Sequence, residues 1–208
     1  MENSYWLKKW EQNDIGFHKN DTHPYLLNHF SSFIKDTHNN VFVPLCGKTI
    51  DMVYLAQKKL HVTGVELSEE AIRAFFNENS IDFTINSNVF SSPQVDLIQE
   101  DLFKIKVNKY DLIYDRASFI AIDPNKRNQY WDKLKILMHE KSYYFLILLE
   151  HIDIMTKRPP FPVTPGLVYD YWGKDKVNLI HQEKVIPPPK HSDYDQEGWT
   201  ESAYIIEL

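Results

Sequence analysis

The chain has 208 residues, 43% of them hydrophobic and 25% charged, as expected for one globular domain with a buried core. Its formal net charge is -6 and its basic residues are scattered along the sequence, which argues against nucleic acid as a partner. The single cysteine, Cys46, excludes an internal disulfide bond, and the lack of an apolar stretch long enough for a signal peptide or a membrane span predicts a soluble, cytoplasmic protein.

Aromatic residues mark the first part of the chain, residues 1–38. Trp6 and Trp10 are one helical turn apart and therefore share one face of a predicted helix. Such a face more often packs in a core than contacts a ligand. This segment precedes the first predicted strand, however, and so falls outside the predicted α/β core. We expect a single domain in which residues 1–38 form a helical lid and residues 39–208 form an α/β core.

Strands and helices alternate through the rest of the chain. Because the predicted strands are apolar throughout rather than alternating, we expect a doubly wound, mostly parallel seven-stranded sheet with helices on both faces. The last two apolar runs have no convincing helix between them, so they should pair as an antiparallel C-terminal hairpin. The predicted strands are 41–45, 61–67, 95–100, 110–115, 142–150, 177–185 and 200–208, and the predicted helices are 50–59, 69–76 and 124–138.

The turn after the first predicted strand contains Gly-Lys-Thr, the end of a phosphate-binding P-loop. A P-loop needs a second glycine at position 42, so that backbone N–H groups can surround the phosphates, but this chain has Phe42 there. Pro44 removes a further donor. A triphosphatase is therefore disfavoured. A nicotinamide-dependent oxidoreductase is disfavoured too, since pyrophosphate binding favours three glycines and this turn has only Gly47.

Polar residues follow the carboxyl ends of four predicted strands, where open α/β sheets bind ligands. Gly47 permits a close approach after the first strand, and Glu66 lies 66 − 47 = 19 positions later, where a carboxylate can accept from both hydroxyls of a ribose. Asp101 follows the third strand, where it can accept from an adenine amino group, and Asp115 and Arg116 end the fourth. Alone, each is more often a cap, a turn residue or a surface pair, so the prediction depends on their being close together.

A nucleoside cofactor without phosphates suits a crevice that has these carboxylates but no glycine-rich turn. S-adenosyl-L-methionine contains ribose and adenine but no pyrophosphate, and it is the predicted cofactor. The histidines of the first part of the chain, at positions 18, 23, 29 and 38, are not spaced as metal ligands, so no metal is predicted.

Five segments together resemble the thiopurine S-methyltransferase family, and the similarity covers almost the whole chain. The PLCGK turn followed by GVELS is specific in combination. The resemblance implies a Rossmann-like class I methyltransferase, expected to be a monomer, that uses S-adenosyl-L-methionine to methylate the sulfur of a small thiol of the thiopurine or aromatic type. The segments are WLKKW with IGFH, VFVPLCGKTIDMVYLA, VTGVELSEEAIRAFF, YDLIYDRASFIAIDP and PPFPVTP.

Pattern and resemblance together assign roles to individual residues. By resemblance, the N-terminal aromatic residues close over the cofactor, and Arg116 matches an arginine near the methionine and acceptor end. Arg116 and Asp115 are the candidate catalytic residues, and His18 is a further candidate base. The cofactor-binding candidates are Trp6, Trp10, Phe17, Leu45, Gly47, Glu66, Asp101, Leu102 and Arg116, and the substrate-binding candidates are Phe17, Arg116 and Pro160.

Two departures from the family pattern leave the methyl acceptor open. Lys19 stands where the family has glutamine, and the C-terminal stretch PPPKHSDYDQEGWTESAYIIEL matches poorly. The alternatives are a methyltransferase for halide ions or for selenium or tellurium species, and a non-catalytic protein that binds an adenosyl ligand. The aromatic N-terminal face and the proline-rich segment KRPPFPVTPG, which would enclose a second small molecule, favour an enzyme.

Overall fold

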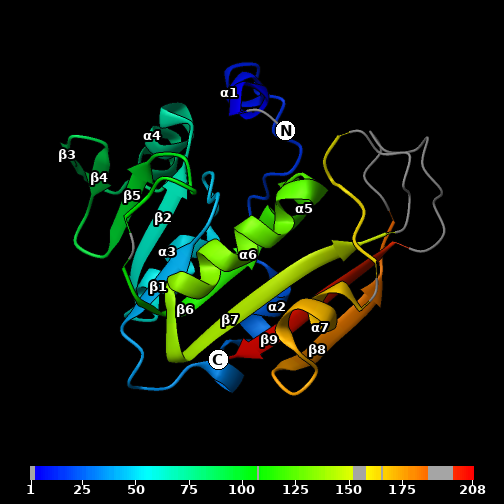
Figure 1. The fold of residues 1–208 in the computed structure, drawn as a ribbon. Coiled ribbons are helices and arrows are strands. Elements are labelled where there is room, and N and C mark those ends of the chain that lie inside the picture. The colour runs from blue at the N-terminus through cyan, green and yellow to red at the C-terminus, as the bar shows by residue number, and fades with distance from the viewer. Residues whose placement is uncertain (1–2, 107, 152–157, 165, 187–198) are drawn as a thin grey trace.

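The computed structural model describes residues 3–106, 108–151, 158–164, 166–186 and 199–208. Their strands are β1 (Asn40–Val43), β2 (His61–Glu66), β3 (Thr84–Asn86), β4 (Val89–Ser91), β5 (Val95–Gln99), β6 (Tyr110–Arg116), β7 (Met138–Glu150), β8 (Val177–Lys184) and β9 (Thr200–Glu207). In this part of the chain they form one nine-stranded sheet in the order β3-β4-β5-β2-β1-β6-β7-β9-β8 (Figure 1).

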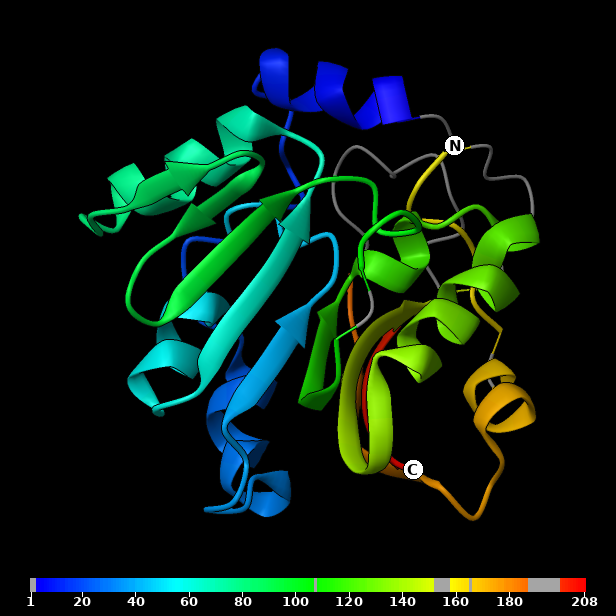
Figure 2. The same cartoon turned by 60° about the vertical axis from the view of Figure 1, so that its left-hand side comes forward.

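Helices cover both faces of the sheet (Figure 2). Those on one face are α2 (Pro24–Phe33), α3 (Asp51–Gln57) and α4 (Glu69–Glu78). Those on the other face are α5 (Ser118–Ala121), α6 (Arg127–Ile136), which follows a short 3-10 helix (Pro124–Lys126), and α7 (Leu167–Trp172). The N-terminal helix α1 (Asn3–Glu11) lies across the edge of the sheet at which β2 and β5 end.

The central strands β5, β2, β1, β6 and β7 run parallel, which confirms the predicted α/β fold class. The residues of β1 show why these runs are apolar. Val41 and Val43 face the core beneath α2, α3 and α4, whereas Phe42 faces the core beneath α5 and α6, and all three are buried. A strand covered on both faces has apolar residues at successive positions.

The sheet has nine strands in the described residues, so the predicted count of seven is wrong. The two additional strands, β3 and β4, form a short hairpin that pairs antiparallel with the edge of β5. All three residues of β3 are exposed, and a strand that contributes little to a core leaves no apolar signal in the sequence. Its position is fixed by backbone pairing, for which residue identity matters less.

The two late strands pair antiparallel, as the sequence predicts, but their places in the sheet follow from the tertiary structure. The last strand, β9, lies between β7 and β8 and is antiparallel to both. This arrangement covers both edges of β9. Its buried residues alternate between the two cores, with Ala203 and Ile205 in one and Tyr204 and Ile206 in the other.

The predicted lid of residues 1–38 divides into two parts. The apolar face of α2 is buried in the core beside α3, so α2 is a layer of the domain and does not cover a crevice. Only α1 lies over the carboxyl edge of the sheet (Figure 1). The sequence patterns of the two helices are alike because burial in a core and burial beneath a lid both require one apolar face.

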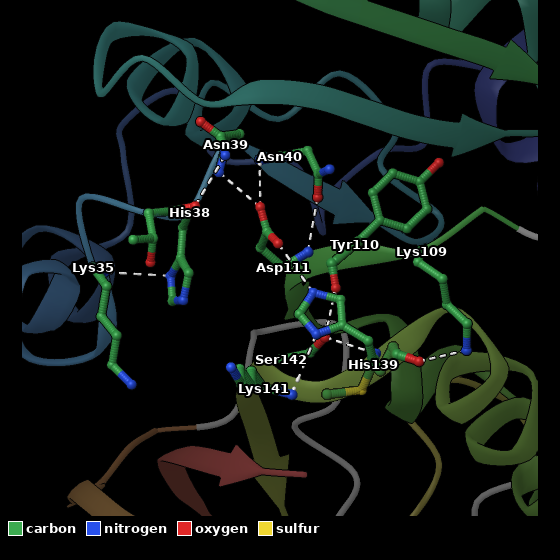
Figure 3. A network of polar contacts seen from close by, with 12 residues as sticks. Lys35, His38, Asn39, Asn40, Lys109, Tyr110, Asp111, His139, Lys141 and Ser142 are labelled. Atoms are coloured by element: carbon green, nitrogen blue, oxygen red, sulfur yellow. Dashed lines mark hydrogen bonds and ion pairs between the residues drawn. The ribbon is translucent and has the colours of Figure 1, made fainter.

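A polar network holds the opposite edge of the sheet, where β1 and β6 begin (Figure 3). Oδ2 of Asp111 accepts the N–H groups of Asn39 (2.7 Å) and Asn40 (3.2 Å), and its Oδ1 lies 3.0 Å from Nε2 of His139. Burial acts to raise the pKa of Asp111, but the backbone N–H groups and His139 lower it overall. These contacts join the start of β6 to the chain at the start of β1 and to the start of β7.

Candidate functional site

The turn between β1 and α3 is fastened to the end of β2. Leu45 and Gly47 have φ angles of 45° and 52°, which reverse the chain sharply. The N–H of Cys46 donates to the carbonyl of Val65 (2.9 Å), and the N–H of Gly47 donates to Oε2 of Glu66 (2.9 Å). These N–H groups are therefore already used within the protein, which fits a ligand that has no phosphate at this turn.

Glu66 is a buried carboxylate that accepts three backbone N–H groups. Its Oε1 accepts from Leu67 (2.7 Å) and Ser68 (2.9 Å), and its Oε2 accepts from Gly47. Burial raises the pKa of Glu66, and the three N–H groups act in the opposite direction. A carboxylate has about four lone-pair positions, so one remains for a further donor such as a ribose hydroxyl. Contact with both hydroxyls of one ribose would need more acceptor positions than this arrangement leaves.

The aromatic residues of the N-terminal segment form a cluster over this turn. A Cβ placed on Gly47 would lie only 3.0 Å from Cζ2 of Trp10, so the indole packs directly on the glycine. The ring of Phe17 makes edge contacts with Trp10 and Trp6, at centroid distances of 5.6 Å and 5.7 Å. Trp10 is buried whereas Phe17 is 42% exposed. The structure thus brings together all three aromatic residues predicted to cover the cofactor.

Asp101 connects the N-terminal helix to the end of β5. Its Oδ2 accepts from Nδ2 of Asn3 in α1 (3.1 Å), and its Oδ1 accepts the N–H of Phe103 (3.0 Å). The second contact is a turn-forming interaction. It is the structural role that the sequence offers as the alternative to adenine binding for this residue. Leu102 is 1% exposed and packs in the core beneath α5 and α6. The α1 helix therefore contacts both the β1 turn and the end of β5.

Asp115 and Arg116 are adjacent in β6, but their side chains lie on opposite faces of the sheet. Asp115 is fully buried, and its Oδ2 accepts the hydroxyls of Tyr130 and Tyr144, both at 2.6 Å. Its Oδ1 accepts the N–H of Ser118 (3.1 Å). Burial raises the pKa of Asp115, and these hydrogen bonds act against the shift. This geometry supports a positioning role for Asp115 more than proton transfer to a substrate.

Arg116 faces the side of the sheet that carries α3. Its Nη1 lies 3.5 Å from Oδ2 of Asp51 and has no hydrogen-bond partner among the described residues. Asp51 is completely buried and also accepts the hydroxyl of Tyr114 (2.8 Å) and the N–H of His23 (2.8 Å). A buried guanidinium nitrogen that lacks a hydrogen bond can accommodate an anionic ligand atom.

Pro160 lies where the proline-rich segment meets the end of β7. Its carbonyl lies 3.1 Å from Nε2 of His151, and the next residue, Phe161, donates its N–H to the carbonyl of Ile120 in α5 (2.8 Å). Since α5 follows directly on the end of β6, these contacts place Pro160 near the carboxyl ends of β6 and β7. The remaining prolines of the sequence motif include Pro165, which lies outside the described residues.

His18 lies in the loop that follows α1. Burial and the positive charges of Lys48 and Arg116 lower the pKa of His18, whereas Glu78 acts to raise it. A neutral imidazole at this position is consistent with the role of a candidate base.

Sequence reasoning did not single out two residues of the site. Asp51 could be recognised as an acidic residue in the first turn of a helix, but its pairing with Arg116 depends on the sheet. Ser118 donates its hydroxyl to the carbonyl of Pro44 (2.8 Å) and so joins the ends of β6 and β1, between which the strand order reverses. A serine at the start of a short helix is the signal that could have identified it.

The arrangement fits a nucleoside ligand that has no phosphates. Glu66 offers a buried acceptor position beside the Gly47 turn, where an added Cβ would lie only 3.0 Å from the indole of Trp10. In the described residues, no group of three histidine, cysteine, aspartate or glutamate side chains is arranged to hold a metal ion. No helix in the described part of the chain is long and apolar enough to span a membrane.

Comparison with solved structures identifies the fold. A 1,6-didemethyltoxoflavin-N1-methyltransferase of Burkholderia thailandensis, solved with S-adenosylhomocysteine, superposes with a TM-score of 0.66 at 12% identity over 99% of this chain and 86% of its own. An S-adenosylmethionine-dependent methyltransferase of Anabaena variabilis ATCC 29413 superposes with a TM-score of 0.63 at 14% identity, over 99% and 94% of the two chains. The sheet and its flanking helices are thus those of class I methyltransferases.

Comparison of sequences identifies the family. The family model for thiopurine S-methyltransferase matches residues 1–207. A thiopurine S-methyltransferase of Shewanella frigidimarina is 38% identical over 178 residues, which cover 82% of this chain and 81% of that protein. A second, from Aliivibrio fischeri ATCC 700601, is 33% identical over the full length of both chains. This chain therefore belongs to the thiopurine S-methyltransferase family, an S-adenosyl-L-methionine-dependent methyltransferase family.

Proposed function

We propose that the protein transfers a methyl group from S-adenosyl-L-methionine to the sulfur of a small thiol of the thiopurine or aromatic type. The observation that carries the choice of acceptor is Arg116 at the carboxyl end of β6. Its buried Nη1 lies 3.5 Å from Oδ2 of Asp51 but has no hydrogen-bond partner among the described residues. A guanidinium there suits a thiolate, which is the reactive form of a thiol. Family membership supports the same reaction.

The cofactor would be held by residues on the carboxyl edge. In this proposal Glu66 accepts from a ribose hydroxyl, Asp101 and Leu102 lie at the adenine, and the backbone at Leu45 and Gly47 follows the ligand closely. Trp6, Trp10 and Phe17 cover it. When bound, S-adenosyl-L-methionine supplies an electrophilic methyl group on a sulfonium.

The chain itself would align the acceptor and exclude water. Arg116 holds the anionic sulfur, Asp115 fixes the end of β6 through its tyrosine contacts, and Phe17 and Pro160 border the acceptor. Positioning of two reactants can contribute on the order of 7–11 kcal/mol to the lowering of the barrier. An aromatic thiol that is already substantially ionised needs little help from a general base.

The proposal includes the organisation of the whole protein. The enzyme is a single methyltransferase domain in which α1 acts as the lid. It works as a monomer, as the family resemblance implies, and in the cytoplasm, as the sequence predicts. Sedimentation of the purified protein and fractionation of cells test these two statements.

Binding and turnover experiments test the function. Calorimetry should show binding of S-adenosyl-L-methionine and S-adenosylhomocysteine and no binding of NAD or of ATP with magnesium. Transfer of radiolabelled methyl groups should then be measured with thiophenol, 6-mercaptopurine, an alkyl thiol, iodide and selenite. Faster transfer to the two aromatic thiols supports the proposal. Faster transfer to iodide or selenite would assign a different acceptor, and cofactor binding without any transfer would indicate a ligand-binding protein.

A further inference from the structure

The proline-rich segment 158–164 has few donors with which to hold itself in place. Three of its seven residues are prolines, which have no backbone N–H. The N–H of Phe161 donates to the carbonyl of Ile120 in α5, and the N–H of Val163 donates to the carbonyl of His151, which follows β7 (3.0 Å). Because buried carbonyl groups require donors, the carbonyls of Phe161 and Pro162 depend on another part of the chain.

Arg127, the first residue of α6, supplies those donors. Its Nη1 donates to the carbonyl of Pro162 (2.7 Å), and its Nη2 donates to the carbonyl of Phe161 (3.3 Å). The guanidinium also lies over the ring of Phe119 in α5, 4.7 Å from its centroid. One side chain thus joins α6, α5 and the proline-rich segment.

The guanidinium of Arg127 is a buried positive charge that the surrounding groups must stabilise. The residue is 7% exposed. Burial lowers the pKa of Arg127 to about 10, so the guanidinium remains charged at neutral pH, and the nearby charge of Asp123 acts to raise it. A buried cation is costly unless it is hydrogen-bonded, and here two carbonyls and an aromatic face receive it. Its planar geometry reaches both carbonyls at once, which a lysine ammonium reproduces only in part.

The segment that Arg127 holds adjoins the acceptor side of the crevice. The N–H of Phe161 donates to the carbonyl of Ile120 in α5, a helix that begins two residues after Arg116. The carbonyl of Pro160 lies 3.1 Å from Nε2 of His151, the residue that follows β7. The segment therefore joins the carboxyl ends of β6 and β7. The cofactor-binding candidates other than Arg116 lie at the ends of β1, β2 and β5 or in the N-terminal segment.

We propose that Arg127 is a positioning residue that holds segment 158–164 over the acceptor side of the crevice and so sets the affinity for the thiol. The inference rests on the proposed function for its acceptor, but the attachment of the segment can be measured independently. The inference separates Arg127 from the cofactor-binding residues. Loss of the hydrogen bonds between Arg127 and segment 158–164 should weaken binding of the thiol and leave binding of the cofactor unchanged.

The test compares the full-length wild type with Arg127→Met, which keeps the apolar stem, and Arg127→Lys, which keeps the charge. Three quantities are measured: the KM and kcat for thiophenol, the Kd of S-adenosylhomocysteine, and hydrogen exchange in peptides covering 158–164. In Arg127→Met the KM should rise roughly tenfold or more, as expected for lost charge-assisted hydrogen bonds, and exchange should accelerate. The Kd should change by less than about twofold, and Arg127→Lys should lie between the other two proteins.

Arg73→Met is the matched control, because Arg73 also lies over a phenylalanine ring, that of Phe90 at 5.3 Å, but on α4. It should leave all three quantities unchanged. Unchanged exchange in Arg127→Met, an unchanged KM, or parallel losses in KM and Kd would each overturn the inference. If Arg127→Met does not fold, Arg127→Lys decides by the same criteria. A wild type that methylates no thiol would instead overturn the proposed function, and hydrogen exchange would still decide whether Arg127 holds the segment.

Discussion

Nη1 of Arg116 lies 3.5 Å from Oδ2 of Asp51, a carboxylate that is completely buried at the start of α3. The same Oδ2 accepts the hydroxyls of Tyr114 and Thr49, and Oδ1 accepts the N–H of His23. Asp51 is therefore held by three groups from different parts of the chain. It provides a fixed negative charge against which the guanidinium of Arg116 is oriented.

Replacement of Asp51 should alter the position of Arg116. In Asp51→Asn one of the two acceptor oxygens becomes a donor that faces other donors, so we expect a loss of roughly 1–3 kcal/mol in the free energy of unfolding. The KM for the thiol should also rise, since Arg116 loses its charged partner. Denaturant unfolding and steady-state kinetics measure the two effects. A variant with an unchanged KM would show that Asp51 serves the fold alone.

Arg116 itself should act mainly on the binding of the acceptor. Thiolate charge disappears as the methyl group is transferred, so an arginine that binds the anion stabilises the ground state as well as the transition state. We expect Arg116→Ala to raise the KM for an aromatic thiol more than it lowers kcat, with a smaller loss of cofactor affinity. Arg116→Lys should restore the charge without the planar geometry and give a partial rescue. Wild-type kinetics in both folded variants would remove Arg116 from the site.

Replacement of Glu66 should weaken cofactor binding. In Glu66→Gln the charge is lost, and the amide nitrogen must face at least one of the N–H groups that the carboxylate now accepts. We expect calorimetry with S-adenosylhomocysteine to show a loss of roughly 1.5–3 kcal/mol in binding free energy. The control is Glu69→Gln, an exposed residue of α4 whose carboxylate pairs with Arg73. Equal affinities in the two variants would contradict the ribose assignment.

The helix α1 should change its dynamics when the cofactor binds. It contacts the rest of the protein through the indole of Trp10 on Gly47 and the side-chain contact of Asn3 with Asp101, both at predicted cofactor positions. Amide hydrogens of residues 3–11 should exchange rapidly without ligand and slowly with S-adenosylhomocysteine. Peptides from α6 serve as the internal reference. Slow exchange in both states would show that α1 is a permanent part of the core.

The polar network in Figure 3 predicts a pH-dependent contribution to stability. Because the pKa of Asp111 is lowered in the folded protein, its contribution is present above the ordinary aspartate pKa of about 3.9 and is lost as the pH falls through the lowered value. Asp111→Asn should therefore cost at most about 1 kcal/mol at neutral pH, since the carboxylate is partly solvated. This difference from the wild type should shrink below about pH 4.

Urea unfolding of both proteins at several pH values measures that difference. Asp96→Asn is the matched control for the loss of an aspartate–histidine pair, because Asp96 pairs with His61 at 2.8 Å. A cost for Asp111→Asn that grows as the pH falls would contradict the assigned sign.

Local patterns in the sequence determined the order of the elements and the edge of the sheet at which a ligand site is predicted. Apolar runs identified the parallel centre and helical spacing identified α4, whose N-cap is Ser68 with its hydroxyl accepting the N–H of Ala71. Phe42 in place of glycine argued against a P-loop without reference to a structure. These features depend on residues close together in the chain, so periodicity and turn chemistry are sufficient to identify them.

The tertiary structure decided which side chains meet. Asp115 and Arg116 are neighbours in the sequence, yet one contacts buried tyrosines and the other pairs with Asp51, because successive residues of a strand face opposite sides of a sheet. The partners come from α3, α6 and β7, and they reach β6 only through the register of the assembled sheet. The local pattern does not specify that register across strands so far apart in the chain, and neither the role of Asp51 nor the hold of Arg127 on the proline-rich segment was visible before the fold.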